Sequence, residues 1–202
     1  MPPILFSLSV TTMGVMAANS FMVPLGTPAP AFDLTAIDGG SVSLGDLEGS
    51  PATLVIFLSN HCPYVRRIED GLAALAKDYG ARLSIVAICS NDSVTYPDDD
   101  PTHLAEQAAR AGFTFPYLLD DTQEVAKAFR AACTPDFFLY DGRLRLAYRG
   151  EFDGARPGNH GPVTGASLRA AIDAVLADEP VPQDQRPSIG CGIKWRPGNE
   201  PA

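Results

Sequence analysis

The residue most suited to chemistry in this sequence is Cys62, which follows an apolar run and precedes a proline. The run, residues 54–58, reads Leu-Val-Ile-Phe-Leu and is typical of a strand buried on both faces. From Ile68 onward, apolar residues recur at helical spacing. Pro63 is tolerated in the first turn of a helix, where its missing N–H would have no partner. The pattern predicts a strand, a short turn and a helix, with Cys62 at the helix N-cap.

A cysteine at a helix N-terminus favours nucleophilic thiol chemistry. Unpaired backbone N–H groups and the helix dipole stabilise a thiolate and can lower a cysteine pKa well below about 8.5. Arg66 and Arg67 follow one turn later and add positive charge. His61 is the ionisable base next to Cys62, so it is either a candidate catalytic group or a solvent-facing turn residue. A free cysteine can also be a small buried hydrophobe, but α/β folds carry their chemistry at such strand ends.

Length and composition indicate one domain with appended tails. The 202 residues can bury a sizeable core, and no second domain is needed. The 15 basic and 24 acidic side chains give a net charge of −9. This charge disfavours nucleic acid and anionic membrane surfaces as partners.

The four cysteines are too few and too scattered for a small disulfide scaffold, and none forms a CxxC pair of the kind that zinc sites use. They are Cys62, Cys89, Cys133 and Cys191. We therefore expect no metal and no cofactor. Thiol chemistry in a reducing compartment fits this usage, which predicts a cytoplasmic location.

The first residues of the chain are apolar and are expected to lie outside the folded domain. Residues 1–20 resemble the apolar part of an export signal, and Met16-Ala17-Ala18 loosely resembles a cleavage site. A signal also needs positive side chains before its apolar part, and the first Lys or Arg is Arg66. We expect residues 1–24 to be an unstructured extension or to be translated from an upstream start codon, with export as the alternative.

The remaining segments alternate between strands and helices. A hairpin turning at Asp38-Gly39 is expected over residues 32–44. A second buried strand, residues 83–89, must run parallel to the first because a crossover helix joins them. The other expected elements are a surface loop at 91–101, helices at 102–112, 122–131 and 164–178, a short strand at 115–119, a hairpin at 133–149 and an irregular, proline-rich tail at 179–202.

This order of elements resembles the thioredoxin fold, and in particular the redoxin branch that includes the peroxiredoxins. The resemblance covers residues 25–178 and is closest at the motifs SNHCPYV and CTPDFFLYD, with a further match in the tail at PSIGCGIKW. It implies an α/β domain with a central mixed β-sheet flanked by helices, an N-terminal β-hairpin and an irregular C-terminal tail.

The same resemblance implies a thiol oxidoreductase with an antioxidant role. Its Cys62 thiolate would attack a small-molecule peroxide, or the disulfide of a protein or small molecule, and these residues do not decide between them. The expected partners are that oxidant and an external thiol reductant, and the protein would be a monomer or a homodimer.

The active-site motif departs from the family patterns. Thioredoxins carry CxxC and peroxiredoxins TxxC, whereas this chain has Cys62-Pro63-Tyr64-Val65. Val65 cannot form a disulfide, so another thiol must resolve an oxidised Cys62. The resemblance also implies that Thr134-Pro135 is the cis-proline pair lying against the active cysteine.

Two cysteines are candidate resolving thiols. Cys133 precedes the Thr134-Pro135 pair, and Cys191 lies in the tail. We prefer Cys191 slightly, because a flexible tail gives reach at a loop-closure cost of only about 0.6 kcal/mol per doubling of length. Cys89, at the end of an apolar strand, is expected to serve packing.

Two other classes of function are open. In the first, the fold binds an extended peptide along the Pro135 edge without turnover. In the second, it binds a metal, as redoxin-like copper chaperones do with CxxxC and a distant histidine. The position of the second cysteine in that motif is Arg66, which cannot ligate a metal.

Overall fold

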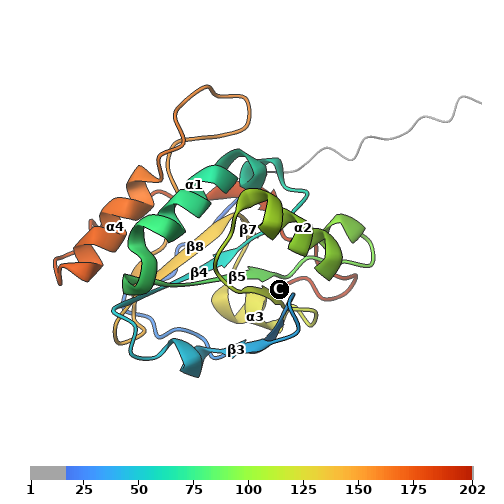
Figure 1. Ribbon diagram of the computed structural model, residues 1–202, viewed down its shortest axis with the longest axis horizontal. Coiled ribbons are helices and arrows are strands. Elements are labelled where there is room, and N and C mark those ends of the chain that lie inside the picture. Colours follow the sequence, from blue (N-terminus) through green and yellow to red (C-terminus); the bar gives the residue numbers. More distant parts are fainter. Residues whose placement is uncertain (1–16, 202) are drawn as a thin grey trace, which may run out of the picture.

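The computed structural model describes residues 17–201 and has a central β-sheet with helices on both faces (Figure 1). The sheet contains seven strands in the order β3-β2-β6-β5-β4-β8-β9. These strands are β2 (Asp33–Ala36), β3 (Ser41–Ser43), β4 (Ala52–Phe57), β5 (Ser84–Cys89), β6 (Tyr117–Leu119), β8 (Asp136–Asp141) and β9 (Leu146–Tyr148). Strands β4, β5 and β6 run parallel and the other neighbours pair antiparallel, so the predicted mixed sheet is confirmed.

Four α-helices and three 3-10 turns join these strands. The helices are α1 (Pro63–Tyr79), α2 (Pro101–Ala111), α3 (Glu124–Phe129) and α4 (Ala166–Leu176), and the turns are η1 (Leu44–Leu47), η2 (Gly80–Arg82) and η3 (Pro97–Asp99). Figure 1 shows α1 and α4 side by side over the sheet, with α3 on the opposite side.

Strand β4 lies in the middle of the sheet and is buried along its whole length. Successive side chains of a strand point to opposite faces. Leu54 and Ile56 therefore belong to the core under α1 and α4, whereas Val55 and Phe57 belong to the core on the α3 side. Burial on both faces explains why the apolar run is uninterrupted.

Helix α1 starts at Pro63 with Cys62 as its N-cap, as the sequence predicts. Its buried residues recur at three- and four-residue spacing, so one stripe of the helix faces the sheet. They include Val65, Ile68, Leu72 and Leu75. The helix ends at Gly80, whose φ of 49° lies in the region that favours glycine. Strand β4 and helix α1 together fix where Cys62 lies.

A second, three-stranded sheet joins segments from distant parts of the chain. It has the order β1-β10-β7, with β1 (Ala17–Asn19), β7 (Cys133–Thr134) and β10 (Ile189–Gly192), and both pairings are antiparallel. Strand β10 lies in the middle, with Cys191 opposite Thr134 on one side and opposite Ala17 on the other.

Two expectations about the ends of the chain need correction. Residues 17–24 were expected to belong to an unstructured extension, but Ala17–Asn19 forms β1; residues 1–16 lie outside the described residues. The tail from residue 179 is irregular over most of its length, as predicted, but contains β10. Each of these strands is stabilised by a partner far away in the sequence, which local patterns do not reveal.

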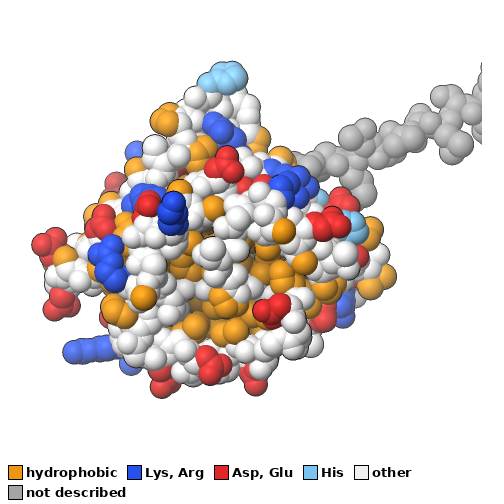
Figure 2. All heavy atoms as spheres, viewed as in Figure 1, with side chains coloured by type: hydrophobic (Ala, Val, Ile, Leu, Met, Phe, Trp, Pro, Cys, Tyr) orange, Lys and Arg blue, Asp and Glu red, His pale blue; other side chains and the backbone are white. Residues whose placement is uncertain are grey.

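The face shown in Figure 2 carries hydrophobic side chains between helices α1 and α2 and strand β3. A hollow on this side of the molecule is lined by Leu47, Ala76, Gly80 and Phe115, among others. Ala76 and Gly80 lie at the end of α1 opposite to Cys62, about 25 Å away at 1.5 Å per helical residue. In the part of the chain that the structure describes, no helix combines the length and apolar character needed to cross a membrane.

A buried ion pair holds the end of β9 against the start of β8. The Arg149 guanidinium lies 3.1 Å from an Asp136 carboxylate oxygen, and both side chains are fully buried. Arg149 also lies over the ring of Phe138, 3.9 Å from its centroid. Asp136 accepts a further hydrogen bond from the Ser20 hydroxyl, 2.6 Å away, next to β1. This pair therefore connects both sheets.

We expect Arg149→Met to lower the free energy of unfolding by about 3–5 kcal/mol, because it leaves the Asp136 carboxylate buried without a counter-charge. The double variant Arg149→Met/Asp136→Asn should lower the free energy of unfolding by less, since neither buried charge remains. Urea titration followed by circular dichroism measures both. Arg143→Met, in the exposed β8–β9 turn, is the control and should change stability by no more than about 0.5 kcal/mol. A single variant as stable as wild type would contradict the argument.

Candidate functional site

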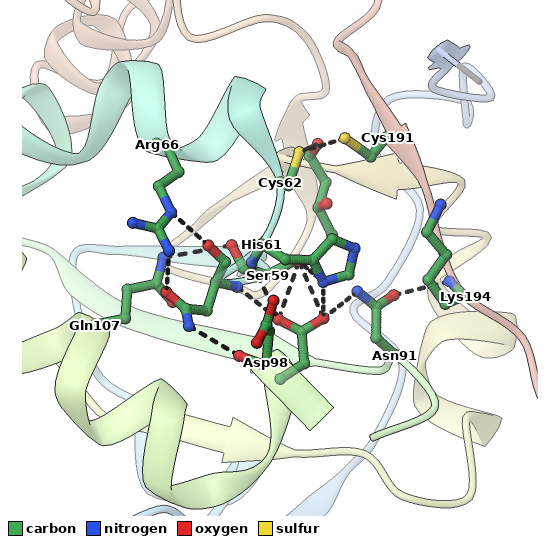
Figure 3. Close-up of polar contacts among 12 residues, drawn as sticks. Ser59, His61, Cys62, Arg66, Asn91, Asp98, Gln107, Cys191 and Lys194 are labelled. Carbon is green, nitrogen blue, oxygen red and sulfur yellow. Dashed lines mark hydrogen bonds and ion pairs between the residues drawn. The ribbon is translucent and has the colours of Figure 1, made fainter. Parts of the chain in front are cut away.

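Cys62 lies where the carboxyl end of β4 meets the first turn of α1, and it is fully buried. Its side chain makes no capping hydrogen bond to the helix. Instead, the sulfur lies 2.7 Å from the sulfur of Cys191 and 3.0 Å from the carbonyl oxygen of Thr134. Figure 3 shows the two sulfur atoms pointing toward each other, with His61 nearby. Three segments, α1, β7 and β10, thus meet at this thiol.

The position of Cys191 follows from strand register. In the β10–β7 pairing, Cys191 is the residue opposite Thr134. The Thr134–Pro135 peptide bond is cis, as the family resemblance implies. The Thr134 carbonyl therefore faces the Cys62 sulfur while the backbone beside it pairs with β10. The structure brings together Cys62, Cys191, Thr134 and Pro135, four of the site residues expected from the sequence.

The surroundings of Cys62 favour its ionised form. Burial alone would raise the pKa of the thiol, but the hydrogen bonds that the Cys191 thiol, the Thr134 hydroxyl and the Val65 backbone can donate to the ionised sulfur outweigh it and lower the pKa to about 6. The Thr134 hydroxyl is buried and makes no other hydrogen bond among the described residues, so it is available to donate to the sulfur once Cys62 ionises. At neutral pH the thiolate is therefore the favoured form of Cys62.

Cys191 has the opposite tendency. Its hydrogen bond to Cys62 raises the pKa of its thiol, and burial acts in the same direction. The pair therefore loses its first proton more easily than its second. This arrangement gives a thiolate at Cys62 and a thiol at Cys191.

The other two cysteines, Cys89 and Cys133, are not in surroundings that favour the thiolate. Cys133 is buried, and burial followed by the charge of Asp136 raises the pKa of its thiol. Its sulfur lies 4.0 Å from the Ser20 hydroxyl and 3.6 Å from the Pro135 carbonyl. Cys89 lies at the buried end of β5, where burial raises its pKa. Of the four cysteines, all within the described residues, Cys62 alone has a lowered pKa.

His61 is held by a carboxylate rather than by solvent. Its Nδ1 lies 2.8 Å from an oxygen of Asp99, and its ring stacks on Tyr96 with centroids 5.5 Å apart. The hydrogen bond to Asp99 raises the pKa of His61, against the effect of burial. The charge of Cys62 raises it further. An imidazolium next to the Cys62 thiolate is therefore favoured.

Asp99 organises the whole turn before Cys62. Its buried carboxylate accepts hydrogen bonds from the Ser59 hydroxyl, the Asn60 backbone N–H at 2.7 Å and the Asn91 amide at 2.6 Å. Burial would raise the pKa of Asp99, but the hydrogen bond from His61 and those from its other donors lower it. Several hydrogen-bond donors thus stabilise the buried negative charge of Asp99.

The sequence did not identify Asp99, because it lies within Asp98-Asp99-Asp100, part of the loop expected at the surface. That expectation needs correction, since Asn91, Asp92 and Asp99 are buried. Acidic runs in loops are usually solvated, so composition alone predicts an exposed Asp99. His61 could have indicated a buried carboxylate, because a buried histidine would need a hydrogen-bond partner.

The two arginines of α1 do not approach the sulfur directly. Arg66 donates to the Asn60 carbonyl, 2.7 Å away, and to the Asn60 side chain. Arg67 donates to the Gly161 carbonyl, 2.7 Å away. Arg66 therefore stabilises the turn, and Arg67 holds the loop before α4. In residues 17–201, no group of three His, Cys, Asp or Glu side chains is arranged to hold a metal ion.

Comparison with known sequences relates the chain to the AhpC/TSA family. The profile of the AhpC/TSA family matches residues 25–149. A candidate peroxiredoxin from Mycobacterium tuberculosis is 31% identical over 106 residues, which cover 52% of this chain and 63% of that protein. The chain thus spans less than two thirds of the length of the curated relatives it matches.

Comparison with solved structures confirms the thioredoxin-like fold. An uncharacterized conserved protein from Geobacillus kaustophilus is 50% identical, with a TM-score of 0.89 over 92% of this chain and 100% of its own. A thiol:disulfide interchange protein of the thioredoxin family from Chlorobium tepidum is 21% identical, with a TM-score of 0.58 over 77% of this chain and 99% of its own. The second similarity concerns the fold alone.

We expect the Cys62 thiolate to titrate near pH 6, because its pKa is lowered to about 6. The thiolate should persist at neutral pH and disappear as the pH falls below that value. Cys191→Ala removes a hydrogen-bond donor, so it should raise the midpoint. The ultraviolet absorbance of the thiolate measures both midpoints, and Cys89→Ala should leave the midpoint unchanged. A wild-type midpoint near the ordinary value of about 8.5 would count against this assignment.

The Asp99 carboxylate should keep His61 protonated above the ordinary pKa of about 6.5. Asp99→Asn removes the negative charge, so the pKa of His61 should fall toward or below that value. Titration of the imidazole signals by NMR measures the change. Asp100→Asn is a matched control, because Asp100 pairs with His103 at 2.9 Å and should lower only the pKa of His103. Equal His61 titrations in wild type and Asp99→Asn would show that the pairing has no effect.

Proposed function

We propose that this chain, which belongs to the AhpC/TSA family, is a thiol oxidoreductase in which Cys62 is the attacking thiolate and Cys191 the resolving thiol. The observation that carries this proposal is the contact between the two sulfurs, 2.7 Å apart. A disulfide bond is about 2.05 Å long, so the pair can join with little movement. The lowered pKa of Cys62 and the raised pKa of Cys191 support this division of roles.

With a hydroperoxide, the Cys62 thiolate attacks one peroxide oxygen and the O–O bond breaks. The hydroxyl group of the peroxide is transferred to the sulfur, so Cys62 becomes a sulfenic acid, and the alkoxide or hydroxide that leaves takes a proton from solvent to become alcohol or water. The Cys191 sulfur then attacks the Cys62 sulfur, the S–O bond breaks, and the hydroxide takes the Cys191 proton to leave as water. The product is a Cys62–Cys191 disulfide, which two molecules of an external thiol reduce again.

With a disulfide as oxidant, the first step gives a mixed disulfide and releases one thiol. Attack by Cys191 on Cys62 then releases the second thiol and forms the same Cys62–Cys191 disulfide. Either oxidant therefore leaves the protein in the same state. Val65, in the position of the second cysteine of thioredoxins, takes no part in either sequence.

The remaining site residues have positioning and electrostatic roles in this proposal. His61, held at Nδ1 by Asp99, provides a positive charge beside the thiolate. The Thr134 carbonyl accepts a hydrogen bond from the Cys62 thiol in its protonated form. Pro135 follows that carbonyl through a cis peptide bond.

Oxidation with stoichiometric hydrogen peroxide should convert the protein to a Cys62–Cys191 disulfide, with the loss of two hydrogen atoms. Cys191→Ala should instead accumulate a sulfenic acid on Cys62, which dimedone traps. Cys133→Ala should still form the Cys62–Cys191 disulfide, because the Cys133 sulfur is turned toward Ser20 and Pro135. Intact mass and non-reducing peptide mapping distinguish these products.

A disulfide between Cys62 and Cys133 would overturn the role of Cys191. A Cys62 that remains unmodified by peroxide and by disulfides would instead favour a non-catalytic, peptide-binding thioredoxin fold.

A further inference from the structure

Strand β10 occupies the edge of β7 beside the reactive thiol. An unpaired strand edge is a template on which an extended peptide can add as a further strand. A protein disulfide approaching Cys62 on this side would have to pair with β7 and place its own cysteine opposite Thr134. In this structure Cys191 takes that place, and its sulfur contacts Cys62. The chain therefore supplies its own strand where a substrate strand would lie.

The approach of β10 to β7 depends on a glycine. A Cβ atom at Gly190 would lie 2.0 Å from the Thr134 carbonyl oxygen, closer than any side chain allows. The neighbouring Gly192 is different, because a Cβ there would meet its nearest atoms, in Ala18 and Ala132, at 3.9–4.0 Å. Of these two glycines, only Gly190 is required for the close approach of β10 to β7. This approach keeps Cys191 against Cys62.

Strand β10 is also held on its other side and at both ends. Strand β1 pairs with it in register, so β10 is an interior strand rather than a loose tail. Before it, the Ser188 hydroxyl donates to the Gly150 carbonyl, 2.9 Å away. After it, the Lys194 backbone bonds to Asn91 and Asp92, each at 2.8 Å. A protein substrate would have to break these contacts to reach the β7 edge.

Cys62 and Cys191 are both buried. The small hollow at the start of β10, lined by Tyr64, Pro135 and Ile189 among others, has a volume of about 10 Å³, roughly the room of one water molecule. Thiol–disulfide exchange needs the attacking sulfur to reach another sulfur, and Cys191 already occupies the β10 side of Cys62. A hydroperoxide presents only a pair of oxygen atoms.

We propose that β10, by occupying the β7 edge beside Cys62, excludes the disulfides of extended polypeptides from this thiol. This inference rests on the proposed function, since it needs Cys62 to be the attacking thiolate. Oxidation then follows the hydroperoxide route: Cys62 is oxidised, the peroxide is reduced to an alcohol or water, and Cys191 releases water on forming the disulfide.

The test compares two oxidants on the full chain. One is hydrogen peroxide, and the other is an extended peptide whose single cysteine is a mixed disulfide with thionitrobenzoate, which releases a coloured thiol when attacked. Wild type should react with peroxide and at least about tenfold more slowly with the peptide. Gly190→Ala displaces β10 from β7, so it should speed up the peptide reaction by about tenfold or more and slow formation of the Cys62–Cys191 disulfide. Gly192→Ala, the matched control, should behave like wild type.

Three outcomes would overturn the inference. Wild type that reacts with the peptide as fast as with peroxide would show that β10 is no barrier, while leaving the thiol chemistry intact. A folded Gly190→Ala variant that reacts with the peptide no faster than wild type would remove the role of β10. If circular dichroism shows that Gly190→Ala does not fold, the inference is tested by the rates of wild type with the peptide and with peroxide. Wild type that reacts with neither oxidant would overturn the proposed function itself, and this inference with it.

Discussion

The carboxylate of Asp99 is ionised and buried, and the turn before Cys62 depends on it. Removing a carboxylate from water is costly unless hydrogen bonds and an opposite charge replace the lost solvation. Here the donors are Ser59, Asn60, Asn91 and His61, two of which lie in the turn directly before His61 and Cys62. The Asp99 charge therefore fixes the path of the backbone between β4 and α1 and favours the protonated form of His61, the residue before Cys62. Without it, the strand and helix would still form, but the residues between them would lose their shared partner.

The same network connects the turn to the segment that carries Cys191. Asn91 donates to Asp99 with its amide nitrogen and accepts from the Lys194 backbone with its amide oxygen. Lys194 follows β10 by two residues, so the position of Cys191 and that of the Cys62 turn are linked through the side chain of Asn91. Gln123 adds a second link, because its side chain donates to the carbonyls of Ser90 and Lys194. The two sulfurs are thus held from both sides by polar contacts rather than by a covalent bond.

The sequence predicted the elements whose evidence is local. The apolar run of β4, the proline at the start of α1 and the glycine at its end are each readable within a few residues, and they place Cys62 correctly. The pairing of β10 with β7 and β1 could not be predicted in this way. The glycines and the cysteine of β10 lie in a proline-rich tail and do not show the apolar–polar alternation that indicates a strand. Asp99 was missed for a similar reason: its burial results from the contact of a loop with a turn 39 residues earlier in the sequence. In both cases, tertiary contacts override what composition suggests.

The distance along the chain between the two sulfurs also affects synthesis. Cys191 follows Cys62 by 129 residues, which at about 5–20 residues per second corresponds to roughly ten seconds of translation. During that interval β4 and α1 can emerge from the ribosome while β10 does not yet exist. Nascent Cys62 then lacks both the donor that lowers its pKa and the strand that covers it. The surroundings of Cys62 are therefore completed only late in biosynthesis, when the segment containing Cys191 becomes available.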